Sequence, residues 1–223
     1  MSSIQEYLSN ITFDDTINNS PYLRPIRMKF NLGLDKKQTT WDIAAEHDSV
    51  AVVLYHTEKE ELLFVRQFRP SVFVGAVRRL PENKGKSLHQ IDFAKYSTDH
   101  GYTLELCAGI VDKPNQTYLE HVKDEVIEEC GYCVPLESIL FLKKFITGIS
   151  FSGSQQSLYY AEINESMYVS CGGGNQNEGE KIENIFMSVQ KVRELLAHDE
   201  LKNPPGFLWA VEWFLKNKLN DYK

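Results

Sequence analysis

Residues 117–132 read TYLEHVKDEVIEECGY and carry the strongest helix signal in the chain. Thr117 can cap the N-terminus of a helix, and Glu120, three residues later, completes a capping box. Gly131 can end the helix because glycine adopts the left-handed conformation without strain. The sequence therefore predicts a helix over residues 118–130.

The predicted helix carries three glutamates beside its apolar stripe. On a helical wheel with about 100° per residue, the stripe that must be buried consists of Leu119, Val122, Val126 and Cys130. Glu125 and Glu129 lie at the edge of this stripe, and Glu128 lies one step further out. Carboxylates at this spacing repel one another by roughly a few tenths of a kcal/mol each. Lys123, the one cation of the helix, lies on the opposite flank.

A divalent cation would relieve this repulsion. Mg²⁺ prefers oxygen ligands and leaves coordination positions for water and phosphate oxygens, so the three glutamates predict a magnesium site. Gly109 lies between a predicted strand and the helix, where the backbone carbonyl of Ala108 or of Gly109 can approach the same ion. Glu178 and Glu180 follow the glycine run 172–174 and could close over a metal-bound substrate. The alternatives are a solvated acidic helix face and an ordinary acidic surface loop.

The rest of the chain is predicted to contain short strands followed by interleaved helices. Strand patterns occupy 26–32, 41–45, 49–56, 61–68, 102–107, 139–147, 155–163 and 183–188. Residues 72–79 predict a further strand, and the polar residues 81–100 predict an excursion over the surface. Ser188 can cap a helix that runs to about 197, and another helix is predicted over 205–219. This order of elements predicts the α+β class.

The charge and length of the chain exclude some functional classes. Its 223 residues include 24 Lys and Arg against 31 Asp and Glu, a formal charge of −7, which argues against a nucleic-acid-binding protein. With 42% hydrophobic residues, the chain can bury the core of one domain with a small appendage. No window approaches the roughly 18 apolar residues of a membrane span, and residues 1–10 lack the features of a signal peptide. We therefore expect a soluble, cytoplasmic protein that binds neither nucleic acid nor membranes.

Four cysteines are present, and the pair Cys130 and Cys133 has a suggestive spacing. A zinc ribbon would need a second close pair. A redox dithiol is the other alternative, but this pair ends the predicted helix, whereas a thiolate is stabilised where a helix begins. Reduced, structural cysteines are therefore the favoured interpretation.

The segment from Gly109 to Tyr132 resembles the Nudix box, a loop–helix–loop motif of the Nudix hydrolase superfamily. The match comprises Gly109, Glu125, Val126, Glu128, Glu129, Gly131 and Tyr132. Further segments resemble the UDP-glucose diphosphatase branch of this superfamily: Ser20–Pro25, Trp41–Asp42, His47–Val50, Arg66–Pro70, Glu105–Asp112, Ser152–Gln155 and Glu178–Glu180. The resemblance covers nearly the whole chain.

Two positions depart from the Nudix box. The first glutamate of the motif would fall at Asn115, and Glu125 lies one residue further along than the pattern allows, so the loop 112–116 contains a single insertion. The basic residue expected before the first helix carboxylate is Asp124 here. By resemblance to the superfamily, that basic residue orients a catalytic glutamate, so its replacement is expected to bear on the pose of Glu125 or Glu128. All three helix carboxylates are retained.

The resemblance implies a fold and an assembly. It implies an α/β/α sandwich around a mixed sheet, with an N-terminal antiparallel β segment over residues 1–45 and a Nudix hydrolase domain over 46–223. The N-terminal segment is expected to help form a homodimer. Trp41 and the strands around it are candidates for that interface, and a buried position in the core is the alternative for this side chain.

The resemblance also implies an activity, the Mg²⁺-dependent hydrolysis of UDP-glucose to UMP and glucose 1-phosphate, with Mn²⁺ able to replace the ion. Glu125 and Glu129 are expected to hold the ion, with Glu128 and the carbonyl of Ala108 as further ligands. The base that accepts the proton of the attacking water is Glu180 or Glu128. The candidates for substrate binding are Arg69, Arg66, Gln67, Ser154 and Gln155.

Two other functions stay open at this point. The first keeps the chemistry but changes the substrate to ADP-ribose or another nucleoside diphosphate sugar. The second is a Nudix-fold binding module without turnover. The change at Asp124 weakly favours this module, and the retained helix glutamates argue against it.

Overall fold

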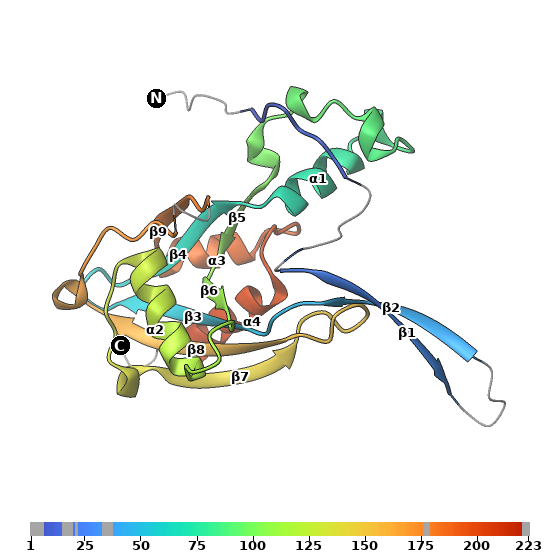
Figure 1. Ribbon diagram of the computed structural model, residues 1–223. Coiled ribbons are helices and arrows are strands. Elements are labelled where there is room, and N and C mark those ends of the chain that lie inside the picture. The colour runs from blue at the N-terminus through green and yellow to red at the C-terminus, as the bar shows by residue number, and fades with distance from the viewer. Residues whose placement is uncertain (1–6, 15–19, 21, 33–37, 176–178, 220–223) are drawn as a thin grey trace.

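A computed structural model of the chain describes residues 7–14, 20, 22–32, 38–175 and 179–219. These residues form a β-hairpin, a seven-stranded sheet and four α-helices (Figure 1). None of the helices in this described part is long and apolar enough to cross a membrane.

The large sheet is mixed. Its strands are β3 (Ser49–His56), β4 (Glu61–Phe68), β5 (Tyr102–Glu105), β6 (Cys107–Ile110), β7 (Leu140–Ile146), β8 (Gln155–Ile163) and β9 (Ile182–Ser188). The main path runs β5-β4-β3-β8-β7, while β6 pairs with β3 and β9 pairs with β4. The β3–β8 pair is parallel, and the other pairs of this sheet are antiparallel. This is the mixed sheet that the family resemblance implied.

Helices cover both faces of this sheet. They are α1 (Pro70–Arg79), α2 (Tyr118–Glu125) with the π-helical turn Val126–Cys130 directly after it, α3 (Val189–Leu196) and α4 (Pro205–Asn217). α2 lies on one face, and α3 and α4 lie on the other (Figure 1). Because successive strand residues point to opposite faces, Val50 and Val52 of β3 belong to the α2 core, and Ala51 and Val53 belong to the α4 core. The predicted α+β class and the α/β/α sandwich are confirmed.

Most predicted elements occur at their predicted places. Strands β3, β4 and β8 have the predicted bounds. The predicted strand over 102–107 is two strands, β5 and β6, which pair with different neighbours. The Ser188 side chain caps α3 by accepting a hydrogen bond from the N–H of Lys191. Short 3₁₀ turns fill several connections: Pro81–Asn83, Leu88–Gln90, Phe93–Lys95, Thr98–His100, Leu136–Ser138 and Glu165–Met167.

The predicted strand over 72–79 is wrong, because this segment lies within helix α1. Val72 and Val74 are spaced as in a strand, but the buried residues are Phe73 and Val77, which lie four apart on one helix face. These two pack with Ile91 and Phe93 of the segment that follows, in a small third core. Helical packing against this core therefore overrides the β-propensity of the valines.

The hairpin of β1 (Arg24–Asn31) and β2 (Gln38–Ala45) projects from the body of the protein (Figure 1). It is the N-terminal antiparallel segment that the resemblance implied. Trp41 is 52% exposed, and its Nε1 donates a hydrogen bond to the carbonyl of Ser150 (2.9 Å). The alternative of a buried core position for Trp41 is therefore wrong.

Candidate active site

The helix that carries the three glutamates begins and ends as its sequence predicts. Thr117 Oγ1 accepts a hydrogen bond from the N–H of Glu120 (3.3 Å), and the Glu120 carboxylate accepts one from the N–H of Thr117 (2.6 Å). Gly131 lies in the left-handed region, with a φ of 79°. Between these caps the last turn, Val126–Cys130, is π-helical and not α-helical. Single π turns inside helices are frequent at functional sites.

Two of the glutamates contact strand β6. Glu129 Oε2 accepts a hydrogen bond from the N–H of Ala108 (3.0 Å), and Glu129 is 3% exposed. A side chain at position 109 would overlap the Glu125 carboxylate, so Gly109 leaves the space that this carboxylate occupies. Glu129 is therefore buried more deeply than the helical wheel predicted, because β6 covers it. Ala108 contacts the site through its N–H, and its carbonyl as an ion ligand stays a prediction.

Burial and mutual repulsion raise the pKa values of these carboxyl groups. Burial raises the pKa of Glu125 to about 7, and the charges of Glu128 and Glu180 add to the rise. Burial also raises the pKa of Glu129 to about 8, and the charge of Glu125 adds to it. The four carboxylates singled out from the sequence therefore lie within electrostatic reach of one another. A bound divalent cation would reverse this effect and favour the ionised forms.

The donor set suits a hard ion such as Mg²⁺, because carboxylate oxygens are its usual protein ligands. Glu125, Glu128 and Glu129 come from one helix, and Glu180 comes from a loop hydrogen-bonded to the end of that helix. In the part of the chain that the structure describes, no three acidic, histidine or cysteine side chains are already arranged as an ion site. Mg²⁺ commonly completes its coordination with water and substrate phosphates, so one or two carboxylates turned toward it are sufficient.

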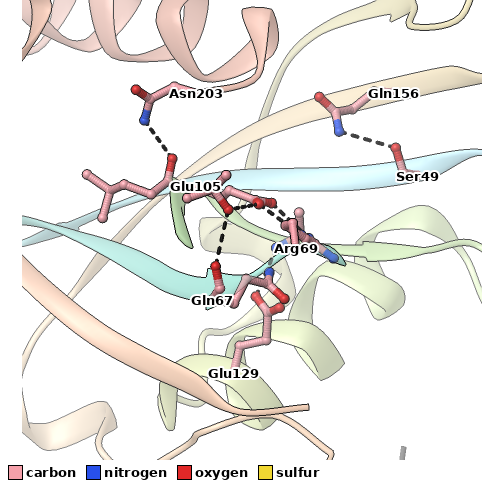
Figure 2. A network of polar contacts seen from close by, with 10 residues as sticks. Ser49, Gln67, Arg69, Glu105, Glu129, Gln156 and Asn203 are labelled. Carbon is pink, nitrogen blue, oxygen red and sulfur yellow. Dashed lines mark hydrogen bonds and ion pairs between the residues drawn. The ribbon is translucent and has the colours of Figure 1, made fainter. Parts of the chain in front are cut away.

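Arg69 follows β4 and is oriented by Glu105 (Figure 2). Its Nε and Nη2 donate hydrogen bonds to the two carboxylate oxygens of Glu105, at 2.9 and 2.8 Å. Thr103 Oγ1 donates a third bond to this carboxylate, at 2.6 Å. The hydrogen bonds to Glu105 raise the pKa of Arg69, and the charges of Glu129 and Glu180 add to the rise. A cation of fixed orientation therefore lies within electrostatic reach of Glu129 and Glu180, and Figure 2 shows Glu129 in the same region as the Arg69–Glu105 pair.

Glu105 is a site residue whose role sequence reasoning missed. It is 8% exposed. Burial raises its pKa, but the hydrogen bonds from Arg69 and Thr103 outweigh burial and leave the pKa below its ordinary value. The signal that could have found it is the antiparallel pairing of β4 and β5, which sets Val65 opposite Glu105. Arg69 has the same parity as Val65 and so reaches Glu105 on that face of the sheet.

Arg66 and Gln67 point to opposite faces of β4, because strand side chains alternate. Gln67 is buried and has the same parity as Val65, which packs in the α2 core. Arg66 has the other parity, pairs with Glu183 (2.9 Å), and lies over the Tyr102 ring with 3.9 Å between the guanidinium carbon and the ring centroid. The structure thus places Gln67 on the glutamate face of the sheet and Arg66 on the opposite one.

Ser154 and Gln155 lie where β8 begins, beside the start of β3. Ser154 Oγ donates a hydrogen bond to Glu46 Oε1 (2.7 Å), and the N–H of Gln155 donates one to Asp48 Oδ1 (2.9 Å). These contacts engage acidic residues that precede β3 and not the helix glutamates. A role of Ser154 and Gln155 in substrate binding stays a prediction.

Asp124, the departure from the Nudix box, has partners in the loop that carries the insertion. Its carboxylate accepts hydrogen bonds from Lys113 Nζ (2.9 Å) and Gln116 Nε2 (3.1 Å). The charge of Lys113 also lowers the pKa of Glu125 and so opposes part of the rise that burial causes. Insertion and substitution therefore form one structural unit, in which Asp124 ties the loop to the helix.

Glu180 is held by the loop that precedes β9. Its Oε2 accepts a hydrogen bond from the N–H of Asn175 (3.1 Å). The neighbouring candidate Glu178 lies outside the described residues.

Comparison with known proteins identifies the family. No family model matches the chain. The uridine diphosphate glucose pyrophosphatase NUDT14 of Mus musculus is 30% identical over 204 residues, which are 88% of this chain and 89% of that protein. The chain belongs to the Nudix hydrolase superfamily.

Other relatives agree with this Nudix assignment. The Bos taurus protein of the same name is 30% identical over 203 residues, which are 87% of this chain and 89% of that protein. A GDP-mannose pyrophosphatase of Salmonella paratyphi B is 25% identical over 198 residues, covering 88% of this chain and 81% of that protein. A crystal structure of an ADP compounds hydrolase matches with a TM-score of 0.59 at 16% identity and covers 90% of this chain and 91% of that one. At this low sequence identity, the match to the ADP compounds hydrolase shows a shared fold and no more.

Proposed function

We propose that this Nudix hydrolase cleaves the diphosphate of a nucleotide sugar in a Mg²⁺-dependent reaction, with UDP-glucose as preferred substrate and UMP and glucose 1-phosphate as products. The observation that carries the proposal is that four carboxylates, Glu125, Glu128, Glu129 and Glu180, lie within electrostatic reach of one another, and that two of them, Glu129 and Glu180, also act on the oriented guanidinium of Arg69. The names of the two relatives at 30% identity support the choice of substrate. A chain with a formal charge of −7 needs both an ion and an arginine to bind a diphosphate.

Glu125, Glu129 and Glu128 are proposed to hold Mg²⁺, with the carbonyl of Ala108 as a further ligand and Mn²⁺ as a substitute ion. When bound, the ion supplies positive charge to the diphosphate oxygens and to the attacking water. Glu129 is proposed as the central ligand because its carboxylate is buried and already fixed by the N–H of Ala108. A ligand that does not need to be ordered at the moment of binding contributes more to affinity.

The proposed reaction is an in-line displacement by water. Water attacks one phosphorus, the bond from that phosphorus to the bridging oxygen breaks, and the bridging oxygen leaves with the other product. Arg69 binds phosphoryl oxygens, and its bidentate contact with Glu105 fixes the plane of the guanidinium before substrate arrives. Glu180 accepts the proton of the attacking water, and Glu128 is the alternative base.

The remaining substrate contacts are proposed from position. Gln67 shares the α2 face with the glutamates and can donate to a phosphate or sugar oxygen. Ser154 and Gln155, beside the start of β3, are proposed to contact the sugar or the uracil. Arg66 is left out of the proposed site, because its side chain lies on the opposite face of β4 and forms an ion pair with Glu183.

Initial rates with UDP-glucose, GDP-mannose and ADP-ribose in the presence of Mg²⁺ test the substrate. We expect kcat/KM for UDP-glucose to exceed the other two by at least about tenfold, equivalent to about 1.4 kcal/mol. A tenfold preference for ADP-ribose or GDP-mannose would keep the chemistry and overturn the substrate. A lack of turnover with all three, together with measurable binding, would favour the binding module.

The N-terminal segment over residues 1–45 is proposed as a dimerisation element beside the hydrolase domain over 46–223. In the hairpin, Ile26 pairs with Ile43 and Met28 pairs with Trp41, so these four side chains share one face. About half of the surface of Ile26, Met28 and Trp41 is exposed. The other face carries the ion pair between Arg27 and Asp42. Exposed apolar patches commonly mark protein interfaces, so this face is proposed to pack against the same face of a second copy of the chain.

Met28→Glu should therefore convert the dimer to a monomer, because a charge in the centre of an apolar interface is costly to bury. Light scattering coupled to size-exclusion chromatography measures the mass, with about twice 25.7 kDa expected for the wild-type chain. Lys29→Glu, one residue along on the polar face, is the matched control and should remain dimeric. A wild-type chain that elutes as a monomer would contradict the proposal.

A further inference from the structure

Helix α2 and its π-helical turn, which together carry Glu125, Glu128 and Glu129, are called the glutamate helix below. Backbone amides of one short segment cover its C-terminal end. The N–H of Gly173 donates to the carbonyl of Glu129 (2.9 Å), and the N–H of Gly174 donates to the carbonyl of Glu128 (3.1 Å). The next N–H along the chain, that of Asn175, donates to Glu180 Oε2 (3.1 Å). Three consecutive amides therefore connect the last carbonyls of the helix, which lack partners within it, to the proposed base.

The return of the chain closes this connection. The N–H of Glu180 donates to the carbonyl of Asn175 (3.2 Å), and the N–H of Ile182 donates to the carbonyl of Gly173 (3.1 Å). Ile182 then begins β9, which pairs with β4 from Gln67 onward. Residues Gly172–Asn175, which we name the glycine clamp, are thus fixed to the helix on one side and to the sheet on the other.

The glycine clamp requires glycine at its successive positions. The φ values of residues 172, 173 and 174 are 62°, 108° and 79°, in the region that side chains disfavour. A Cβ at 172 would overlap the Glu129 carbonyl. A Cβ at 174 would lie 3.0 Å from both Glu180 Oε2 and Ile182 Cδ1, so these side chains would have to shift to accommodate it. The last glycine therefore leaves room for the proposed base itself.

We propose that the glycine clamp positions the Glu180 carboxylate against the glutamate helix, with Gly174 as the residue that sets its place. The inference rests on the proposed function, in which Glu180 accepts the proton of the attacking water. A general base must lie within hydrogen-bond reach of that water, and a misplacement of about 1 Å can cost about a hundredfold in rate. Gly174 contacts the end of the glutamate helix and Glu180, so a change at Gly174 should affect kcat more than KM.

Gly174→Ala tests this role against the control Gly179→Ala. Both glycines have nearly the same φ, 79° and 78°, so both substitutions carry the same backbone strain. A Cβ at 179 meets nothing within 4 Å, whereas a Cβ at 174 meets Glu180. With UDP-glucose and Mg²⁺ we expect Gly174→Ala to lower kcat by at least about tenfold with KM within about twofold, and Gly179→Ala to lower kcat by less than about threefold. Should Gly174→Ala not fold, Gly174→Asn tolerates the positive φ and still places a Cβ against Glu180.

A double-mutant cycle with Glu180→Gln separates positioning from general damage to the fold. If Gly174 acts through Glu180, Gly174→Ala costs nothing further in the Glu180→Gln background. Losses that multiply, or equal losses in Gly174→Ala and Gly179→Ala, would overturn the positioning role and leave the proposed function intact. Glu180→Gln with wild-type kcat would instead remove Glu180 as the base, and the inference would fall with it.

Discussion

Replacing Glu129 by Gln should lower kcat by about a thousandfold or more while the protein remains folded. Gln is nearly isosteric, and its amide oxygen can still accept the hydrogen bond from the N–H of Ala108. What it removes is the negative charge of the most buried helix glutamate. Charge stabilisation by a bound ion contributes several kcal/mol in the transition state, and a loss of about 4 kcal/mol corresponds to about a thousandfold in rate. Steady-state kinetics with UDP-glucose at saturating Mg²⁺ measure the effect.

Glu120→Gln is the matched control, because Glu120 lies on the same helix but at its N-terminal cap, where it is half-buried and hydrogen-bonded to Thr117. That variant should keep nearly wild-type stability and kcat, because glutamine can also complete the capping box with Thr117. Titration calorimetry should detect Mg²⁺ binding to the wild-type chain and to Glu120→Gln but not to Glu129→Gln. Removal of the ion with EDTA should abolish wild-type turnover, and added Mg²⁺ should restore it. Wild-type kinetics in Glu129→Gln would refute the metal assignment.

In the absence of an ion, Glu129 should make the stability of the wild-type chain fall with rising pH. In the folded chain, burial first and the charge of Glu125 next raise the pKa of Glu129 from 4.5 to about 8. A carboxyl group with a raised folded-state pKa contributes stability below its unfolded value, and this contribution is lost as the pH rises to the folded value. Between pH 5 and pH 9 the unfolding temperature of the ion-free wild-type chain should therefore fall more than that of Glu129→Gln.

Elements whose bounds depend on neighbouring residues in the chain could be predicted from the sequence. The Thr117 and Gly131 caps set both ends of the glutamate helix, and short hydrophobic runs set β3, β4 and β8, which have eight, eight and nine residues. The strand predicted over 72–79 was wrong because its valines favour a strand, whereas packing of Phe73 against Ile91 and Phe93 favours a helix. No local pattern contains that contact.

In the candidate site too, local features could be predicted and contacts between distant segments could not. Carboxylates on one helix could be predicted from spacing alone, but their partners come from elsewhere in the chain. Arg69 and Glu105 meet because β4 and β5 pair, and Gly174 meets the helix across a loop. The π turn at 126–130 also escapes a wheel drawn with α-helical spacing. Interactions of this kind depend on which strands become neighbours, which one sequence does not specify locally.

Replacing Arg69 by Ala should lower kcat/KM by about a hundredfold to a thousandfold, the range seen when one hydrogen-bond donor to a developing oxyanion is removed. Two losses combine in this variant. Substrate phosphate loses a guanidinium of fixed orientation, and Glu105 keeps a largely buried carboxylate without its bidentate partner. Breaking a fully buried pair costs about 3–5 kcal/mol in stability. The Arg69 side chain is 42% exposed, so solvent screening should reduce that cost to about 1–2 kcal/mol.

Three variants distinguish phosphate binding from structural damage. Arg69→Lys keeps the charge but cannot make the bidentate contact, so it should recover stability more fully than kcat/KM. Arg66→Ala removes a guanidinium from the same segment, but from the opposite face of β4, where Glu183 engages it, and should cost less than about threefold. Glu105→Gln keeps Arg69 but removes the charge that orients it, so KM should rise while the fold survives. If Arg66→Ala and Arg69→Ala had equal effects, the strand-parity argument would be wrong, and the phosphate contact would have to be sought on the other face of the sheet.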